Sequence, residues 1–336
     1  MVRIAPFAVE QWMDEYETTP GVLNVAETCA ASVSIDDLVG ITEDTKLVAE
    51  DIVVTQGAIG ANFLALYSLI GPNDHVVCVY PTYQQLYEVP RSIGAEVSLW
   101  KLKEEESFVP NVDELINLIR KNTKVNILKR ELGRIAQIAK EKGIILFSDE
   151  VYRPLFHGGA SGKIDIPKSA MTLGYERTIT TGSMSKGYAL AGIRVGWIAS
   201  KDKSIISAIM AARDYTTISV SQIDDQVARY ALSPAVLPSL VDRNLTLARN
   251  NAKLVKEFIE RYKTVCSWVE PMAGTTAFVR FIKNGQPIND VNFCLDLLSK
   301  NNVLFVAGSK CFGNDEDFKG YIRMGYVCET HVLVED

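Results

Sequence analysis

The 336-residue sequence is poor in the patterns that mark several classes of protein. Its three histidines and six cysteines are scattered, without a C-x-x-C pair or metal-ligand spacing, so neither a metal site nor a disulfide framework is predicted. No apolar run reaches the roughly 20 residues that cross a bilayer, and the acidic N-terminus does not resemble a signal peptide. A net charge of -6 gives no reason to expect nucleic acid or an anionic membrane as a partner. These absences favour a cytoplasmic protein that binds small molecules.

The composition that remains, 47% hydrophobic and 23% charged, is that of a globular chain long enough for two domains. From about residue 50, short β-branched runs alternate with helical patterns, beginning with EDIVVT, a glycine and AIGANFLALYSLI. Further strands are expected at HVVCVY, EVSLWKL, KVNI, IILFSDE, RTITT and IRVGWIAS, and helices at NVDELINLIRKN and LKRELGRIAQIAKEKG. Such alternation predicts an α/β fold with a mainly parallel sheet and helices on both faces.

The pattern changes after residue 200, where the predicted helices become longer. DKSIISAIMAARDY and SQIDDQVARYAL precede a helical stretch from Pro234 to Tyr262. Strands then return at TTAFVRF, VLFVAG and YIRMGYV, with the helix INDVNFCLDLLSKN between the first two. We therefore expect a mixed α+β unit at the C-terminus, joined to the rest by a long helix.

The stretch SMSKGYALAGIRVG, residues 183–196, places Lys186 directly after a predicted strand, where open α/β sheets bind ligands. A lysine amine becomes a nucleophile when a partly desolvated pocket and nearby positive charge remove its proton. Ser183, Ser185 and Arg194 supply hydroxyls and a guanidinium for a phosphate. A lysine beside a phosphate site predicts a phosphorylated carbonyl ligand, and pyridoxal 5'-phosphate, bound through a Schiff base, requires both.

The pattern S-x-S-K followed by G-x-R-x-G resembles the cofactor-attachment motif of class I/II aminotransferases, which are fold-type I pyridoxal-phosphate enzymes. The resemblance extends from residue 50 to 328. It implies an aspartate-aminotransferase-like fold, with a mainly parallel seven-stranded sheet in a large domain, 46–235, and a smaller α+β domain, 236–336. Residues 1–45 would belong to the small domain and the active-site entrance, and two copies would form a homodimer with active sites at its interface.

Two further motifs of the family concern the cofactor. In SDEVYRPL, Asp149 matches the carboxylate that keeps the pyridine nitrogen protonated, and Tyr152 matches the tyrosine that bonds the ring's phenolic oxygen. In TQGAIGAN, a strand, a glycine turn and a helix N-terminus would bind the phosphate through the amides of Ala58 and Ile59.

Tyr83 in YPTYQQLY matches the aromatic ring that stacks on the cofactor, and Arg323 in GYIRMGYV matches the arginine that binds the substrate carboxylate. The resemblance therefore implies a transaminase that moves an amino group between an amino acid and a 2-oxo acid through a Lys186 Schiff base. The released lysine would move a proton between the substrate α-carbon and the cofactor. Two alternatives stay open: a cysteine-conjugate β-lyase, which uses the same apparatus, and a non-catalytic ligand-binding member of the fold.

Two elements of the family do not occur in the sequence. An N-x-x-N-P-x-G loop would be expected between the strand at 124 and the helix near 130, and a Y-G-x-x-x-G segment before EDIVVT. TKVNILKRELGRI also passes from strand to helix without a cap or turn residue, and the C-terminus stops where a last helix is expected. We expect that the sequence here joins segments across loops that it omits. If these loops are instead truly deleted from the protein, cofactor affinity and activity would be lower. The sequence identifies neither the amino donor nor the 2-oxo acid.

Overall fold

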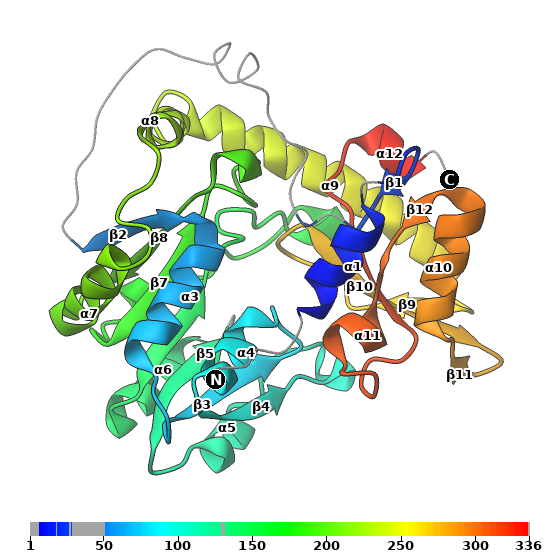
Figure 1. Ribbon diagram of the computed structural model, residues 1–336. Helices are drawn as coiled ribbons and strands as arrows, with labels where there is room; N and C mark the ends of the chain where they lie inside the picture. Colours follow the sequence, from blue (N-terminus) through cyan, green and yellow to red (C-terminus); the bar gives the residue numbers. More distant parts are fainter. Residues whose placement is uncertain (1–6, 18, 27, 29–50, 129–131, 335–336) are drawn as a thin grey trace.

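The computed structural model describes residues 7–17, 19–26, 28, 51–128 and 132–334, and a seven-stranded sheet forms its centre (Figure 1). In spatial order the strands are β2 (Ile52–Gln56), β8 (Val195–Ser200), β7 (Thr178–Ser183), β6 (Ile145–Asp149), β5 (Thr123–Leu128), β3 (His75–Tyr80) and β4 (Glu96–Lys101). Only β8 runs against the other strands of this sheet. The prediction of a mainly parallel seven-stranded sheet is confirmed.

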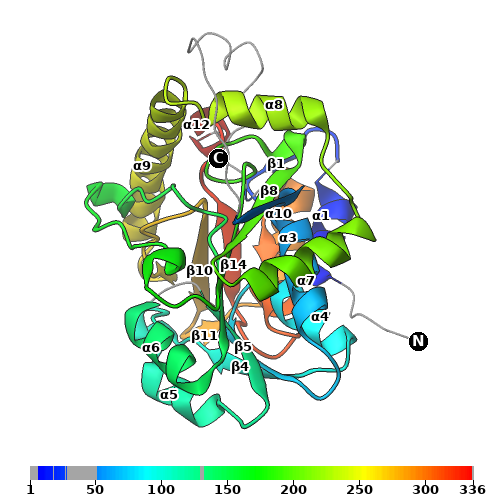
Figure 2. The same ribbon diagram turned by 90° about the vertical axis from the view of Figure 1, so that its left-hand side faces the viewer.

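Helices cover both faces of this large sheet (Figure 2). One face packs against α3 (Gly57–Leu69), α4 (Gln85–Ser92) and α7 (Lys203–Asp214), and the other against α5 (Val112–Leu118) and α6 (Leu132–Lys142). A strand that is covered on both sides needs apolar residues at successive positions rather than at alternate ones. β3, HVVCVY, is accordingly buried at every position.

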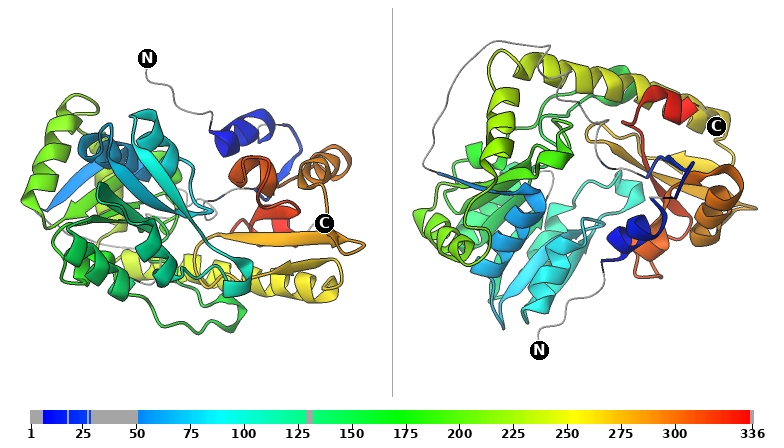
Figure 3. Two further views of the ribbon diagram at one scale, coloured as in Figure 1. Left: turned by 90° about the horizontal axis from the view of Figure 1, so that it is seen from below. Right: turned by 45° about the horizontal axis from the view of Figure 1, so that its top comes forward.

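A smaller antiparallel sheet lies beside the large one (Figure 3). Its strands are β11 (Gln286–Pro287), β10 (Thr276–Lys283), β14 (Tyr321–Gly325) and β13 (Val306–Ala307), and β9 (Cys266–Trp268) also pairs with β10. The helices α10 (Asp290–Asn301), α11 (Gly308–Phe312) and α12 (Thr330–Val334) belong to the same part of the chain. α1 (Ala8–Tyr16) packs against α11, and β1 (Leu23–Asn24) pairs with β12 (Val303–Leu304) in a separate two-stranded sheet, so the described N-terminal residues pack with the C-terminal part of the chain. The predicted domain boundaries stay a prediction.

A long helix, α9 (Leu237–Arg261), follows α8 (Gln222–Ala231) and extends along the molecule from the large sheet to the smaller one (Figure 1). Two of its asparagines, Asn244 and Asn251, are fully buried and lie two turns apart on one face. Asn244 Nδ2 donates to the carbonyl of Gly187 at 3.0 Å, while Asn251 Nδ2 donates to the carbonyls of Tyr326 at 2.8 Å and Cys328 at 2.9 Å. The helix is therefore hydrogen-bonded to the loop after β7 and to the chain after β14.

Three predicted elements end or begin elsewhere in the structure. The helix expected over NVDELINLIRKN ends at Leu118, because Ile119 is extended with ψ 129°. The strand expected at IRVGWIAS begins only at Val195, because Arg194 has a left-handed φ of 51°. The run VLFVAG forms two short strands, β12 and β13, rather than one.

The predicted missing loop would fall at residues 129–131 and the predicted missing Y-G segment before residue 51. Both lie outside the described residues, as do residues 335–336 at the C-terminal end.

Candidate active site

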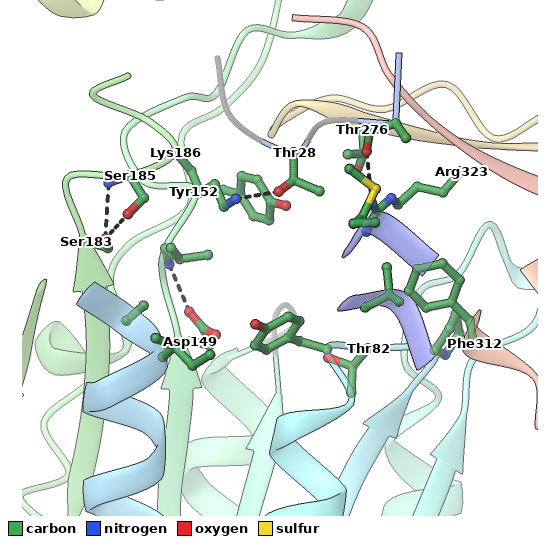
Figure 4. Close-up of a pocket in the computed structure, with 18 of the residues that line it drawn as sticks. Thr28, Thr82, Asp149, Tyr152, Ser183, Ser185, Lys186, Thr276, Phe312 and Arg323 are labelled. Atoms are coloured by element: carbon green, nitrogen blue, oxygen red, sulfur yellow. Dashed lines mark hydrogen bonds between the residues drawn. The ribbon is translucent and has the colours of Figure 1, made fainter. Parts of the chain in front are cut away.

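A pocket of about 510 Å³ opens at the carboxyl ends of β6 and β7 and is closed on the other side by the smaller sheet and α1 (Figure 4). All ten residues that the sequence analysis singled out line it: Ala58, Ile59, Tyr83, Asp149, Tyr152, Ser183, Ser185, Lys186, Arg194 and Arg323. They come from segments up to 265 positions apart, so the fold brings together a set that the sequence shows only as separate motifs.

Lys186 follows β7 and reaches into the pocket, where its Nζ donates a hydrogen bond to the hydroxyl of Thr28 (Figure 4). Thr275 in turn donates from its hydroxyl to the carbonyl oxygen of Thr28. The sequence analysis placed the N-terminal segment at the entrance by resemblance but did not single out Thr28. Its contact with Lys186 spans 158 positions, and no local pattern indicates it.

An anion cradle forms where α3 meets the loop after β7. The first-turn amides of a helix have no partner within it, and Gln56, the N-cap residue, makes no side-chain cap bond to them among the described residues. Beside this helix end, the hydroxyls of Ser183 and Ser185 lie 2.8 Å apart, and Arg194 Nη1 donates to Ser185 at 3.3 Å. Gly57 makes the approach possible: its φ is +68°, and a Cβ there would lie 2.7 Å from Arg194 Nη2. Hydroxyls, a guanidinium and a helix N-terminus together suit a phosphate.

The carboxylate of Asp149, at the end of β6, is held from two sides. Its Oδ2 accepts from Asn62 Nδ2 and its Oδ1 from the amide of Val151, each at 3.0 Å. Asn62 is 1% exposed, and its own Oδ1 accepts from the hydroxyl of Thr181 at 2.7 Å. Sequence reasoning missed Asn62, although a polar residue on the buried face of the apolar helix α3 was a usable signal. The carboxylate is thus fixed in orientation at the pocket floor.

Tyr152 packs on Gly274, whose φ is +82° and whose Cβ, if present, would lie 3.4 Å from the tyrosine ring. The carbonyl of Gly274 accepts from the Tyr326 hydroxyl at 3.2 Å, and that hydroxyl lies 2.6 Å from His157 Nε2. Because the amide of Gly159 donates to His157 Nδ1, the proton of the neutral ring is on Nε2 and points to Tyr326. Burial lowers the pKa of His157 to about 4 and raises the pKa of Tyr326. A buried, uncharged network therefore supports the Tyr152 ring.

Arg323 lies on β14, across the pocket from Lys186 and Asp149 (Figure 4). Its Nη2 donates to the carbonyl of Ala26 at 2.9 Å, and its guanidinium carbon lies 5.5 Å from the centre of the Phe312 ring. A carboxylate that reaches this guanidinium would be held opposite the lysine amine.

Neither a metal-binding cluster nor a membrane-spanning helix occurs in the described part of the chain. No group of three or more His, Cys, Asp or Glu side chains there is arranged to hold a metal ion. No helix in it has both the length and the apolar character needed to cross a membrane.

Comparison with known proteins identifies relatives over nearly the whole chain. Residues 14–330 match the family described as aminotransferase class I and II. The capreomycidine synthase of Streptomyces vinaceus is 28% identical over 290 residues, which cover 82% of this chain and 70% of that one. The aspartate aminotransferase of Thermotoga maritima is 26% identical over 302 residues, covering 85% and 73%. A solved pyridoxal-phosphate-dependent aminotransferase from Streptococcus suis superimposes with a TM-score of 0.86 at 32% identity, covering 99% of this chain and 96% of the other.

Proposed function

The chain belongs to the class I and II aminotransferases and its cofactor is pyridoxal 5'-phosphate, and from this premise we propose that it moves an amino group between an amino acid and a 2-oxo acid. One observation carries the proposal: Lys186, the anion cradle, the Asp149 carboxylate and Arg323 line a single pocket. A module that only binds a ligand has no need of a lysine amine that faces both a phosphate site and a carboxylate anchor.

The chemistry of the donor set fits the cofactor. Ser183, Ser185 and Arg194, with the first amides of α3, would hold its phosphate. Asp149, oriented by two hydrogen bonds, would keep a proton on the pyridine nitrogen. Tyr152 would donate to the phenolic oxygen. Each polar group of pyridoxal phosphate therefore has a partner of complementary charge or hydrogen-bonding capacity.

The cofactor, when bound, supplies an aldehyde carbon that reacts with amines and a ring that withdraws electrons from the reacting carbon. Arg323 would bind the substrate α-carboxylate in a bidentate pair and so turn the α-carbon toward the opposite wall. Lys186, as a neutral amine, would take the proton from the α-carbon and pass it to the cofactor, and it would carry a proton in the opposite direction when the 2-oxo acid receives the amino group. The hydroxyl of Thr28, itself anchored through Thr275, would hold the lysine nitrogen on the correct side.

A second outcome of the same proton removal, β-elimination, is the alternative left open by the sequence, and one 28% identical relative is named a synthase and not an aminotransferase. If the substrate carries a leaving group on its β-carbon, the electron pair left at the α-carbon can expel that group. The residues that bind and deprotonate the substrate would be the same. The products distinguish the two, because elimination needs no 2-oxo acid acceptor.

Borohydride reduction of the protein with pyridoxal phosphate, followed by peptide mass spectrometry, tests the covalent role of Lys186. We expect one modified peptide, which contains residue 186, and no modification in Lys186→Ala; Lys168→Ala, an exposed lysine, is the control and should label normally. Amino-group transfer is then measured with a panel of amino acids and 2-oxoglutarate or pyruvate, and pyruvate release is followed without an acceptor. A protein that labels but catalyses neither reaction would contradict the proposal.

We further infer a homodimer, as the family resemblance implied. Helix α3 exposes an apolar row with a spacing of four, in which Ile59 is 42% exposed, Phe63 40% and Tyr67 56%. Ile59 also lines the pocket, so a partner on this face would adjoin the active site. Sedimentation equilibrium should give twice the chain mass and a shift toward monomer in Phe63→Lys; a monomeric wild type would contradict the inference. The cytoplasmic location stays a prediction.

A further inference from the structure

We propose that the amino donor carries a bulky apolar side chain, and that Phe108 is a specificity-determining residue for it. The inference rests on the proposed function, because it places the donor's carboxylate on Arg323. It concerns the wall of the pocket beyond that arginine, which neither the cofactor nor the α-carboxylate would occupy.

Three aromatic rings form this wall. Phe278 lies directly opposite Arg323 in the β10–β14 pairing, so both side chains are on one face of the smaller sheet. The Phe312 ring lies against the Arg323 guanidinium, and the centres of Phe278 and Phe312 are 5.9 Å apart. Phe108 completes the row at 6.4 Å from Phe278. A side chain that extends from a carboxylate bound at Arg323 therefore meets aromatic surface first.

Aliphatic side chains continue the same surface. Val9 and Met13, one turn apart on α1, line the pocket together with Leu102, which follows β4. All three are buried or half-buried. Transfer of an apolar group from water to such a surface is favourable by about 25 cal/mol for each Å² that it buries.

Phe108 differs from the other rings because it belongs to the large sheet's connection between β4 and α5. Ser107 and Phe108 both have left-handed backbone angles, with φ of 54° and 53°, which residues with a side chain rarely adopt. Contacts to the smaller sheet hold the connection in place: Glu104 pairs with Arg280 at 3.1 Å and accepts a hydrogen bond from the Tyr321 hydroxyl. The strained turn is thus maintained by bonds to the smaller sheet, and its Phe108 ring lines the pocket.

The charges of the described lining residues disfavour an acidic donor side chain. Arg323 would be paired with the α-carboxylate, and Glu17 is the other charged residue that lines the pocket near α1. A second carboxylate on the substrate would lie among three phenyl rings, and a buried carboxylate without a cation is strongly unfavourable. The pocket therefore differs in preference from the relative that is named an aspartate aminotransferase.

Single-turnover conversion of the bound cofactor by individual amino acids tests the inference. We expect kcat/KM for phenylalanine and leucine to exceed that for alanine and aspartate at least about tenfold, as expected for several buried methylene groups. Binding of unreactive acids gives an independent readout: 3-phenylpropionate should bind more tightly than succinate. Phe108→Ala should lower kcat/KM for phenylalanine about 10- to 100-fold and that for alanine less than about threefold. Phe108→Leu should recover most of the loss, and Val109→Ala, an exposed neighbour outside the pocket, should change neither value.

The possible failures are distinguishable. A preference for aspartate would overturn the inference, as would a preference for arginine that is lost in Glu17→Gln. An equal loss for all donors in Phe108→Ala would also overturn it, because a purely structural role has that effect. If no amino acid converts the cofactor, the proposed function itself fails.

Discussion

Acid should destabilise this protein in part through the buried histidine His157. The side chain is fully buried, its Nδ1 accepts from the amide of Gly159, and its Nε2 donates to Tyr326. A protonated imidazole carries hydrogen on both nitrogens. In that form the N–H at Nδ1 would face the amide N–H of Gly159, so protonation removes this hydrogen bond. It also places a positive charge at a site that is shielded from water.

The size of the effect follows from the two pKa values. Burial lowers the pKa of His157 in the folded protein to about 4, whereas an unfolded chain has a histidine pKa of about 6.5. Between these values the unfolded state binds more protons, so the free energy of unfolding is unaffected by this group above about pH 7 and falls as the pH falls toward 4. One pKa unit corresponds to about 1.36 kcal/mol, so a pKa difference of about 2.5 lowers the free energy of unfolding by about 3 kcal/mol. The charged neighbours Arg249 and Glu270 act in opposite directions and are smaller influences.

Urea unfolding of wild type and His157→Gln at about pH 7.5 to 4 measures how much unfolding free energy each protein loses as the pH falls. Glutamine stays uncharged and can still donate toward Tyr326, so the variant should lose about 3 kcal/mol less than wild type over the range. His331→Gln, at an exposed histidine, should keep the wild-type dependence. Parallel curves for wild type and His157→Gln would refute the reasoning.

Two further predictions concern the anion cradle and the long helix. Gly57→Ala should weaken pyridoxal phosphate binding about tenfold in equilibrium dialysis, because the new Cβ would displace the guanidinium of Arg194 and the residue has a φ of +68°. Gly60→Ala is the control and should bind normally, since its new Cβ would lie no nearer than 3.7 Å to another side chain. Equal affinities of Gly57→Ala and Gly60→Ala for pyridoxal phosphate would contradict the proposal that the anion cradle binds its phosphate. Asn244→Leu should lower the free energy of unfolding by about 1–3 kcal/mol in urea, because the carbonyl of Gly187 loses its donor. It should also slow the proposed half-reaction, since Gly187 directly follows Lys186. Exposed Asn250→Leu is the matched control, and an equal response of the two variants would refute the role of Asn244.

The sequence predicted those site residues that stand beside a local pattern. Lys186 comes shortly after an apolar strand, and Asp149 and Arg194 lie in motifs that resemble those of the family, so local pattern and resemblance together pointed to residues that the structure brings into one pocket. The residues that orient them have no such signal: Asn62 contacts Asp149 across 87 positions and Thr28 contacts Lys186 across 158. Their partners are set by the order of strands and by how the smaller sheet packs, which one sequence does not display.

Tertiary packing also explains why two predicted elements begin or end at other residues in the structure. A strand pattern continues through IRVGWIAS, but Arg194 leaves the extended conformation because its guanidinium must reach the helix end at Gly57. The helix pattern of NVDELINLIRKN likewise continues past Leu118, where the chain turns toward β5 instead. In both places tertiary contacts overrule a local preference that is worth only a few tenths of a kcal/mol per residue.

Helix α9 connects these observations, because its two buried asparagines hold opposite ends of the proposed reaction site. Asn244 binds the carbonyl directly after Lys186, and Asn251 binds the chain three residues beyond Arg323. Seven helical residues rise about 10 Å, and an α-helix hardly stretches. The separation of Lys186 and Arg323 is therefore constrained by a helix behind the pocket. If Lys186 and Arg323 act as proposed, the substrate has to fit a distance that the fold constrains in advance, and such positioning lowers a reaction barrier.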